Sequence, residues 1–234
     1  MNTRFKMKKD MDTPAGKNPR ITIHQWLPVG LAICGALLAL WLRYSLRLHV
    51  TNDYLCCSEV WYDYIKQDGH YAFINAFSNL SMPILYVWYL ISLLVRDLPT
   101  LLAVKIPAIV CDFILAYYFY KIISIKTTNT WLRLAAFLVP LFTPTVFFNS
   151  AWWGQYDSVY AAPVIAGIYY LLKKKETTAF LFFGLAFSVK FQMVFILPVL
   201  LVLLLCKQVN WKSFLLIPGV YLVSILPARC EAGH

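Results

Sequence analysis

Two polar segments interrupt a strongly apolar chain, and they hold most of the side chains that could carry out acid-base chemistry. Residues 47–80 contain Asp53 soon after an apolar run, and residues 149–163, NSAWWGQYDSVYAAP, contain Gln155 and Asp157 beside paired tryptophans. A carboxylate that accepts the proton of an attacking hydroxyl group acts as a general base. Both segments are therefore candidates for a reactive site.

Asp53 has a simpler interpretation as a solvated loop acid, which is the usual state of an isolated carboxylate. Glu59 and Asp63 share this ambiguity, and they are further candidates for substrate binding. If residues 59–68 form a helix, these two acids lie one turn apart on one face. Such a pair could contribute to a metal site, but no third ligand is evident, so the sequence predicts no metal site.

In the second segment, Asp157 precedes an apolar run and could also be an N-cap that accepts hydrogen bonds from free helix amides. Gln155 offers both donors and an acceptor, and Gly154 lets the backbone approach a partner closely. Pro144 and Pro163 flank the region, where each is expected to kink or end a helix. Structural and functional interpretations both stay open at this point.

Lys190 is the costliest charge in the chain, because it lies in SVKFQ, residues 188–192, within a long apolar run. Ionisable side chains at such depth usually face a cavity or a partner. Lys190 could reach the membrane interface, pair with Asp112, or attract an anion to which Gln192 adds hydrogen bonds. A helix broken here would add free amide groups that favour a phosphate.

Composition indicates a membrane protein. Of the 234 residues, 60% are hydrophobic and 14% are charged, and the mean hydropathy is +0.63. Soluble domains have about 45–50% apolar and about 25% charged residues. Strand-like alternation is absent, and a chain in lipid must satisfy its own backbone hydrogen bonds. The sequence therefore predicts an all-α fold, a polytopic transmembrane helical bundle.

The net charge of +10 does not indicate nucleic acid, because the basic residues gather in the N-terminal tail and in short clusters between apolar runs. This distribution favours membrane lipid as a partner and argues against nucleic acid. The six cysteines show no metal-ligand spacing.

Three regions follow from the pattern. Residues 1–25 form a basic tail, cytoplasmic by the positive-inside rule, residues 26–228 form the transmembrane domain, and residues 229–234 form a short C-terminal tail. The run at 26–46 is a first transmembrane helix rather than a signal peptide, because no small-residue cleavage site follows it. The external loop 47–80 is rich in aromatic residues and is predicted to hold short helices at the membrane interface.

Further apolar stretches occupy residues 81–95, 100–123, 131–148, 158–172, 177–206 and 213–227. The fifth is longer than one crossing needs and is expected to be two shorter helices separated at SVKFQ. Lys173–Lys175 should be cytoplasmic, which puts residues 149–157 on the same side as Asp53. That orientation needs an odd number of crossings over 81–123, so one helix there should be partial, with a break expected at Pro107.

Six segments follow one another in a characteristic order: Asp53-Tyr54, WYDYIKQDG (61–69), NLSMPILYVWYL (79–90), KIPAIVCDFILA (105–116), NSAWWGQYDSVYA (149–161) and SVKFQMVFILP (188–198). In this order they resemble the GT-C superfamily of integral-membrane glycosyltransferases. Within it, the chain is similar to bacterial proteins related to the mannosyltransferase that adds the second mannose to GPI anchors. The most specific part is WGQYDS followed by Lys-x-Gln and a proline.

The resemblance implies a GT-C-like N-terminal module in a bacterial inner membrane, with its active site outside the cytoplasm. It implies a mannosyltransferase-like enzyme that passes a sugar from a polyprenyl-phosphate donor to a lipid-linked or protein acceptor. Asp53 holds the position of the general base, and Gln155, Asp157, Lys190 and Gln192 hold motif positions that line the donor and acceptor cavity. No cofactor is implied beyond the donor itself, and a role for a divalent metal stays open.

Members of the superfamily continue with several more helices beyond the Lys-x-Gln element, so the chain corresponds to about the first half of a typical relative and is expected to be truncated. Two alternatives stand beside the enzyme. One is a non-enzymatic transporter or flippase component, in which Lys190, Asp112 and Asp157 would be coupling groups. The other is an inactive truncated fragment. Internal repeats, which many transporters have, are not found.

Overall fold

The computed structural model of the protein describes residues 23–231, including the side chains of residues 26–226. Every regular element in this part of the chain is a helix, which confirms the all-α prediction. Most of the predicted basic tail, residues 1–25, and the last residues of the predicted C-terminal tail, 229–234, lie outside the described residues.

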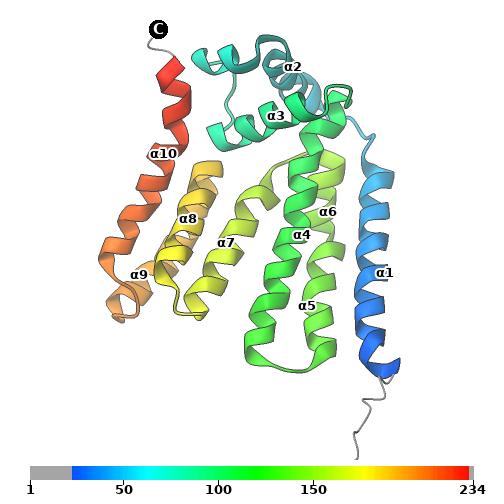
Figure 1. Cartoon of the computed structure of the whole chain (residues 1–234), viewed down its shortest axis with the longest axis vertical. Coiled ribbons are helices and arrows are strands. Elements are labelled where there is room, and N and C mark those ends of the chain that lie inside the picture. The colour runs from blue at the N-terminus through cyan, green and yellow to red at the C-terminus, as the bar shows by residue number, and fades with distance from the viewer. Residues whose placement is uncertain (1–22, 232–234) are drawn as a thin grey trace, which may run out of the picture.

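The described residues form a row of helices that run along the long axis, covered at the upper end by α2 and α3 (Figure 1). The α-helices are α1 (Ile23–Leu46), α2 (Glu59–Asp68), α3 (Met82–Leu94), α4 (Thr100–Lys126), α5 (Thr130–Phe142), α6 (Pro144–Phe147), α7 (Asp157–Leu172), α8 (Glu176–Val189), α9 (Leu197–Leu205) and α10 (Leu216–Glu231). Short 3₁₀ or π turns join them at η1 (Tyr54–Ser58), η2 (Gly69–Ile74), η3 (Phe148–Trp153), η4 (Phe191–Ile196) and η5 (Trp211–Leu215).

Two of the described helices are long and apolar enough to cross a membrane, namely Trp26–Leu46 and Thr100–Lys126. Thr130–Phe142 and Pro144–Trp153 make a third candidate if this pair, bent by 47°, counts as one span. The break between the two follows from Pro144, which cannot continue the helix of α5.

The outer surface of the helices carries large apolar side chains that no other element covers. Leu37 is 61% exposed, Trp41 62% and Leu205 81%. Soluble monomers rarely expose contiguous apolar surface on this scale. This surface and the spanning helices together support a membrane protein.

Of the two helices predicted over residues 81–123, α3 is the partial one. Its 13 residues measure about 20 Å at 1.5 Å per residue, less than the roughly 30 Å of a hydrocarbon core, and it lies across the upper end of the row (Figure 1). The break expected at Pro107 is wrong, because α4 runs through this residue without interruption. Membrane helices tolerate proline where neighbouring groups satisfy the freed carbonyl.

The break predicted at SVKFQ is confirmed. Helix α8 ends at Val189, and Lys190 has an extended backbone (φ −153°, ψ 131°) before η4 and α9 begin. The hydroxyl group of Ser81, the residue before α3, donates to the Val189 carbonyl at 2.7 Å. One of the carbonyls left free at the end of α8 is thereby satisfied.

Close approach between α7 and α8 requires a small residue. A Cβ atom at Gly167 would lie 2.4 Å from the ring of Phe183. Without a hydrophobic force between helices in lipid, close packing at small residues is a main source of helix association. The two helices are joined by the tight turn at Lys173–Lys175, in which Lys174 has φ +59°.

A fully buried ion pair ties five elements together. The Arg43 Nε of α1 donates to the Asp112 Oδ2 of α4 at 2.8 Å. Ser150 of η3 donates to the same oxygen at 2.5 Å, and Ser158 of α7 donates to Oδ1. A second nitrogen of Arg43 reaches the Leu141 carbonyl of α5 at 3.1 Å. The alternative in which Asp112 pairs with Lys190 is therefore wrong.

We expect the single substitutions Arg43→Met and Asp112→Leu to destabilise the protein by about 3–5 kcal/mol each, because either one leaves an unpaired buried charge. The double variant should recover most of that loss. Unfolding in detergent micelles, followed by circular dichroism, checks this. Ser124→Ala on the same helix is the control, since Ser124 bonds only to a carbonyl within α4. Single variants as stable as this control would contradict the assigned role of the pair.

We expect α1, α4, the bent pair Thr130–Trp153 and α7 to cross the membrane and α3 not to cross it. Position 52 should then lie on one side of the membrane and positions 126 and 174 on the other. Asn52, Lys126 and Lys174 are all exposed. Each is replaced by cysteine in a background whose six native cysteines have been removed, and then labelled with an impermeant maleimide. Labelling of positions 52 and 126 from the same side would overturn this topology.

Candidate functional site

A buried lysine holds the two polar segments side by side. The ammonium group of Lys105 donates to the carbonyl oxygens of Arg47 at 3.1 Å, His49 at 2.7 Å and Trp152 at 3.0 Å. The first two carbonyls belong to the chain leaving α1, and the third belongs to η3. Lys105 lies two helical turns before Asp112, so α4 presents both groups on one face.

Residues 149–155 form a closed loop above this lysine. The backbone amides of Gly154 and Gln155 both donate to the Asn149 carbonyl at 3.0 Å. Gly154 has φ +81°, a conformation that glycine adopts without steric cost. A Cβ atom at this position would lie 3.4 Å from Lys105 Cγ, so a side chain there would also press against the lysine.

The structure brings Asp53 and Gln155 together, although they are 102 positions apart in the chain. Asp53 Oδ2 accepts hydrogen bonds from Trp153 Nε1 at 2.7 Å and from Gln155 Nε2 at 3.1 Å. The carboxylate is exposed. It borders a cavity of about 370 Å³, which is lined by Thr51, Asn52, Asp53, Trp152 and Trp153.

The second polar cluster is centred on Asp157, two residues after Gln155 in the segment 149–163. Lys190 forms an ion pair with Asp157 Oδ1, and Asn149 Nδ2 donates to Asp157 Oδ2 at 2.9 Å. The ammonium group also lies 5.8 Å from the centre of the Tyr160 ring. The side chains of Lys190 and Asp157 are 28% and 46% exposed. This pair is therefore open to a ligand, unlike the buried pair of Arg43.

Asp157 is not the N-cap of α7, as one interpretation of the sequence had it. Asp157 is the first residue of α7 and Tyr156 is the cap position, with no side-chain capping bond. An acid in the first turn still interacts favourably with the positive end of the helix dipole. Its carboxylate, however, is taken by Lys190 and Asn149 rather than by helix amides.

The remaining predicted residues are not brought into these clusters. The helix expected at 59–68 is present as α2, but Glu59 accepts a hydrogen bond from Tyr54 at 3.1 Å and Asp63 accepts one from Thr100 at 2.8 Å. Burial, and then the hydrogen bond to Glu59, raise the pKa of Tyr54 and keep its phenol protonated as the donor. Glu59 thus links α2 to the preceding turn η1, and Asp63 links α2 to the start of α4.

Gln192 is exposed, and no hydrogen bond links its side chain to another described residue. Within residues 23–231, no group of three His, Cys, Asp or Glu side chains could hold a metal ion.

Sequence reasoning missed Lys105 and Trp153. A signal for Lys105 was present, because a lysine in the first turns of an apolar helix needs a partner just as Lys190 does. Trp153 carried no such signal, since tryptophan at the edge of an apolar run is ordinary in a membrane protein. Its role becomes visible only when the loop at Gly154 turns its indole nitrogen toward Asp53.

Comparison of the chain with protein-family models, with curated proteins and with solved structures gave no match. The resemblance to GT-C glycosyltransferases therefore stays a prediction carried by the segments quoted above.

We expect Lys105→Met to loosen the junction between the two polar segments, because three carbonyls lose a charged donor. Amide hydrogen exchange at Gly154 and Gln155 should accelerate by about tenfold or more, the effect of losing about 1.4 kcal/mol of local stability. Lys66→Met on the exposed face of α2 is the matched control. Unchanged protection in the Lys105 variant would show that the loop holds itself.

Proposed function

We propose that this protein is a membrane glycosyltransferase of the mannosyltransferase type. It would transfer a sugar from a polyprenyl-phosphate donor to a hydroxyl group of a lipid-linked or protein acceptor, outside the cytoplasm of a bacterium. The observation that carries the proposal is the exposed Asp53 carboxylate, held by Trp153 and Gln155 beside a cavity at the end of the membrane-spanning helices.

Asp53 suits the role of general base. Its Oδ2 atom is fixed by two donors, so Oδ1 is left to accept a proton from the acceptor hydroxyl as the new glycosidic bond forms. A positioned base of this kind contributes about 10²–10⁴-fold to a rate. Trp152 and Trp153 border the cavity, and they limit the directions from which an acceptor can approach the carboxylate.

The Lys190–Asp157 pair suits the leaving group. When the sugar departs from a polyprenyl phosphate, negative charge grows on the phosphate, and a nearby ammonium group stabilises that charge. Lys190 is partly exposed, and the first amides of α7 lie in the turn that Asp157 begins. The sugar carbon itself becomes cation-like during transfer, so acids near it favour the same transition state.

The transporter alternative gains no support from Asp112, one of the three coupling groups that it would use. Asp112 is fully buried, and both of its oxygens already accept hydrogen bonds from Arg43, Ser150 and Ser158. A coupling group must gain and lose a partner during transport. Asp112 instead has the surroundings of a fixed structural group.

We expect Asp53→Asn to lower sugar transfer by about 10²–10⁴-fold, because the amide cannot accept the hydroxyl proton. The assay uses the purified protein in liposomes with radiolabelled polyprenyl-phosphate mannose and a lipid extract as acceptor source. Asp68→Asn, an exposed acid on α2, is the control and should keep full activity. Circular dichroism confirms that each variant is folded.

Lys190→Gln should also lower the rate of sugar transfer. When two polyprenyl-phosphate sugars are compared, the loss should be larger for the one whose phosphate is the poorer leaving group. If the Asp53→Asn variant kept full sugar transfer, the role of Asp53 as general base would be contradicted. Absence of transfer by the unaltered protein with every polyprenyl-phosphate sugar would overturn the proposed function itself.

A further inference from the structure

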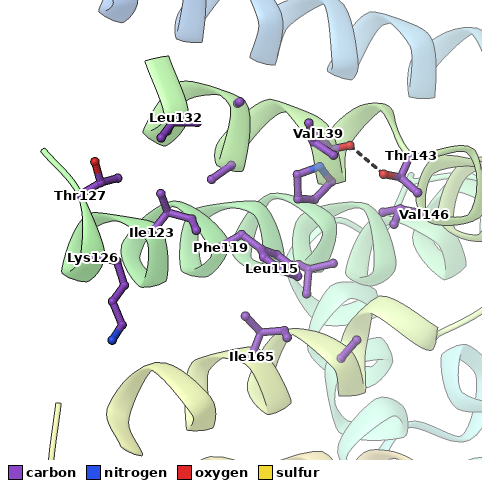
Figure 2. A pocket seen from close by; sticks show the side chains of 14 residues that line it. Leu115, Phe119, Ile123, Lys126, Thr127, Leu132, Val139, Thr143, Val146 and Ile165 are labelled. Carbon is purple, nitrogen blue, oxygen red and sulfur yellow. Dashed lines mark hydrogen bonds between the residues drawn. The ribbon is translucent and has the colours of Figure 1, made fainter. Parts of the chain in front are cut away.

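A long apolar groove lies between α4, α5 and α7, away from the two polar clusters (Figure 2). Its volume is about 870 Å³, within the range of about 300–1,000 Å³ that ligand pockets occupy. Leu115, Phe119 and Ile123 of α4 form one wall, as Figure 2 shows. The groove exists because alanines stand where larger side chains would fill it, at positions 135, 136 and 161.

Apart from Lys126 at one end, the polar side chains that line the groove are two threonines, and both already take part in hydrogen bonds. The hydroxyl of Thr143 donates to the Val139 carbonyl at 2.8 Å (dashed line in Figure 2), and the hydroxyl of Thr127 accepts from the Asn129 amide at 3.0 Å. A molecule bound here is therefore apolar over most of its length.

One end of the groove is cationic. Lys126 lines this end and is exposed (Figure 2), and neither of the two ion pairs found among the described residues involves it. Further basic residues lie at the same lower end of the molecule in Figure 1, where α4 meets α5 and where α7 meets α8. This basic end consists of Lys121, Lys126, Arg133 and Lys173–Lys175. The occupant therefore carries an anionic group at the basic end.

The length of the groove matches one leaflet. From Leu115 to Lys126, α4 advances eleven residues, about 16 Å at 1.5 Å per residue. One leaflet contributes about half of the roughly 30 Å hydrocarbon core. An acyl chain that starts at a headgroup beside Lys126 would thus reach the bilayer midplane near Leu115.

We propose that this groove holds one acyl chain of an anionic glycerophospholipid, whose phosphate pairs with Lys126 in the leaflet at the basic end. This inference does not depend on the proposed function. A sugar donor bound in this groove would have its phosphate at Lys126, at the end of α4 opposite Asp53 and Lys105. The groove is therefore a separate lipid site and not the donor site.

The test measures retained lipid by native mass spectrometry after the protein is extracted from nanodiscs of equal phosphatidylglycerol and phosphatidylcholine. The unaltered protein should retain phosphatidylglycerol in preference. Lys126→Gln should reduce that preference about fivefold, which corresponds to about 1 kcal/mol per basic residue near an anionic headgroup. Lys66→Gln, at the other end of the molecule, is the control and should leave the preference unchanged.

Ala136→Leu should abolish retention of both lipids, because it fills the groove. Ala161→Leu fills the same groove from α7 and serves if the first variant does not fold. Gly219→Leu on α10 is the control for added bulk, since a side chain there meets open space. Equal retention of the two lipids, retention unaffected by both alanine variants, or displacement of phosphatidylglycerol by a polyprenyl phosphate would overturn the proposal.

Discussion

A carboxylate without water must find its partners within the protein, and Asp112 shows how far this constraint reaches. To satisfy one buried side chain, the fold brings together α1 through Arg43, η3 through Ser150 and α7 through Ser158. Each of these bonds replaces hydration that lipid cannot supply. The positions of three separate elements around α4 thus follow from the chemistry of one carboxyl group.

Lys105 extends the same arrangement toward the upper end of α4. It binds backbone carbonyls rather than a carboxylate, so it fixes the path of the chain and not a particular side chain. The 149–155 loop then closes over it and carries Trp153 and Gln155 to Asp53. The position of the exposed Asp53 cluster therefore depends on three buried charged side chains outside it, Arg43, Asp112 and Lys105.

Much of the helical structure could be predicted from the sequence, because the length and hydropathy of a run govern whether it is helical in lipid. The break at Lys190 was also predictable, because a charged side chain within a long apolar run must reach a polar partner or a cavity. The partner of that charge was not predictable. The sequence shows that a lysine in an apolar run needs a counter-charge. Whether Asp112 or Asp157 supplies it depends on which helices are neighbours in the fold.

The same limit explains the other errors. Pro107 breaks a helix in water, but α4 is packed on several sides and passes through it. Asp157 had the sequence context of an N-cap, but Lys190 competes for its oxygens across 33 positions of chain. No local sequence pattern predicts that Asp53 and Gln155 lie close together. Only the order of the motifs along the chain indicated it.

If α1 and α4 both cross the membrane, helix α3 decides on which side of it the later parts of the chain lie. Its 13 residues are roughly seven short of the twenty or so that a crossing requires. A slightly longer apolar run at this point would cross, and the parity of every later segment would then be reversed. Asp53 would stay where α1 leaves it, while Trp153 and Gln155 would emerge in the other compartment. Because α3 is short, the two polar segments can lie on the same side of the bilayer and meet. With a longer helix here, the bilayer would separate them.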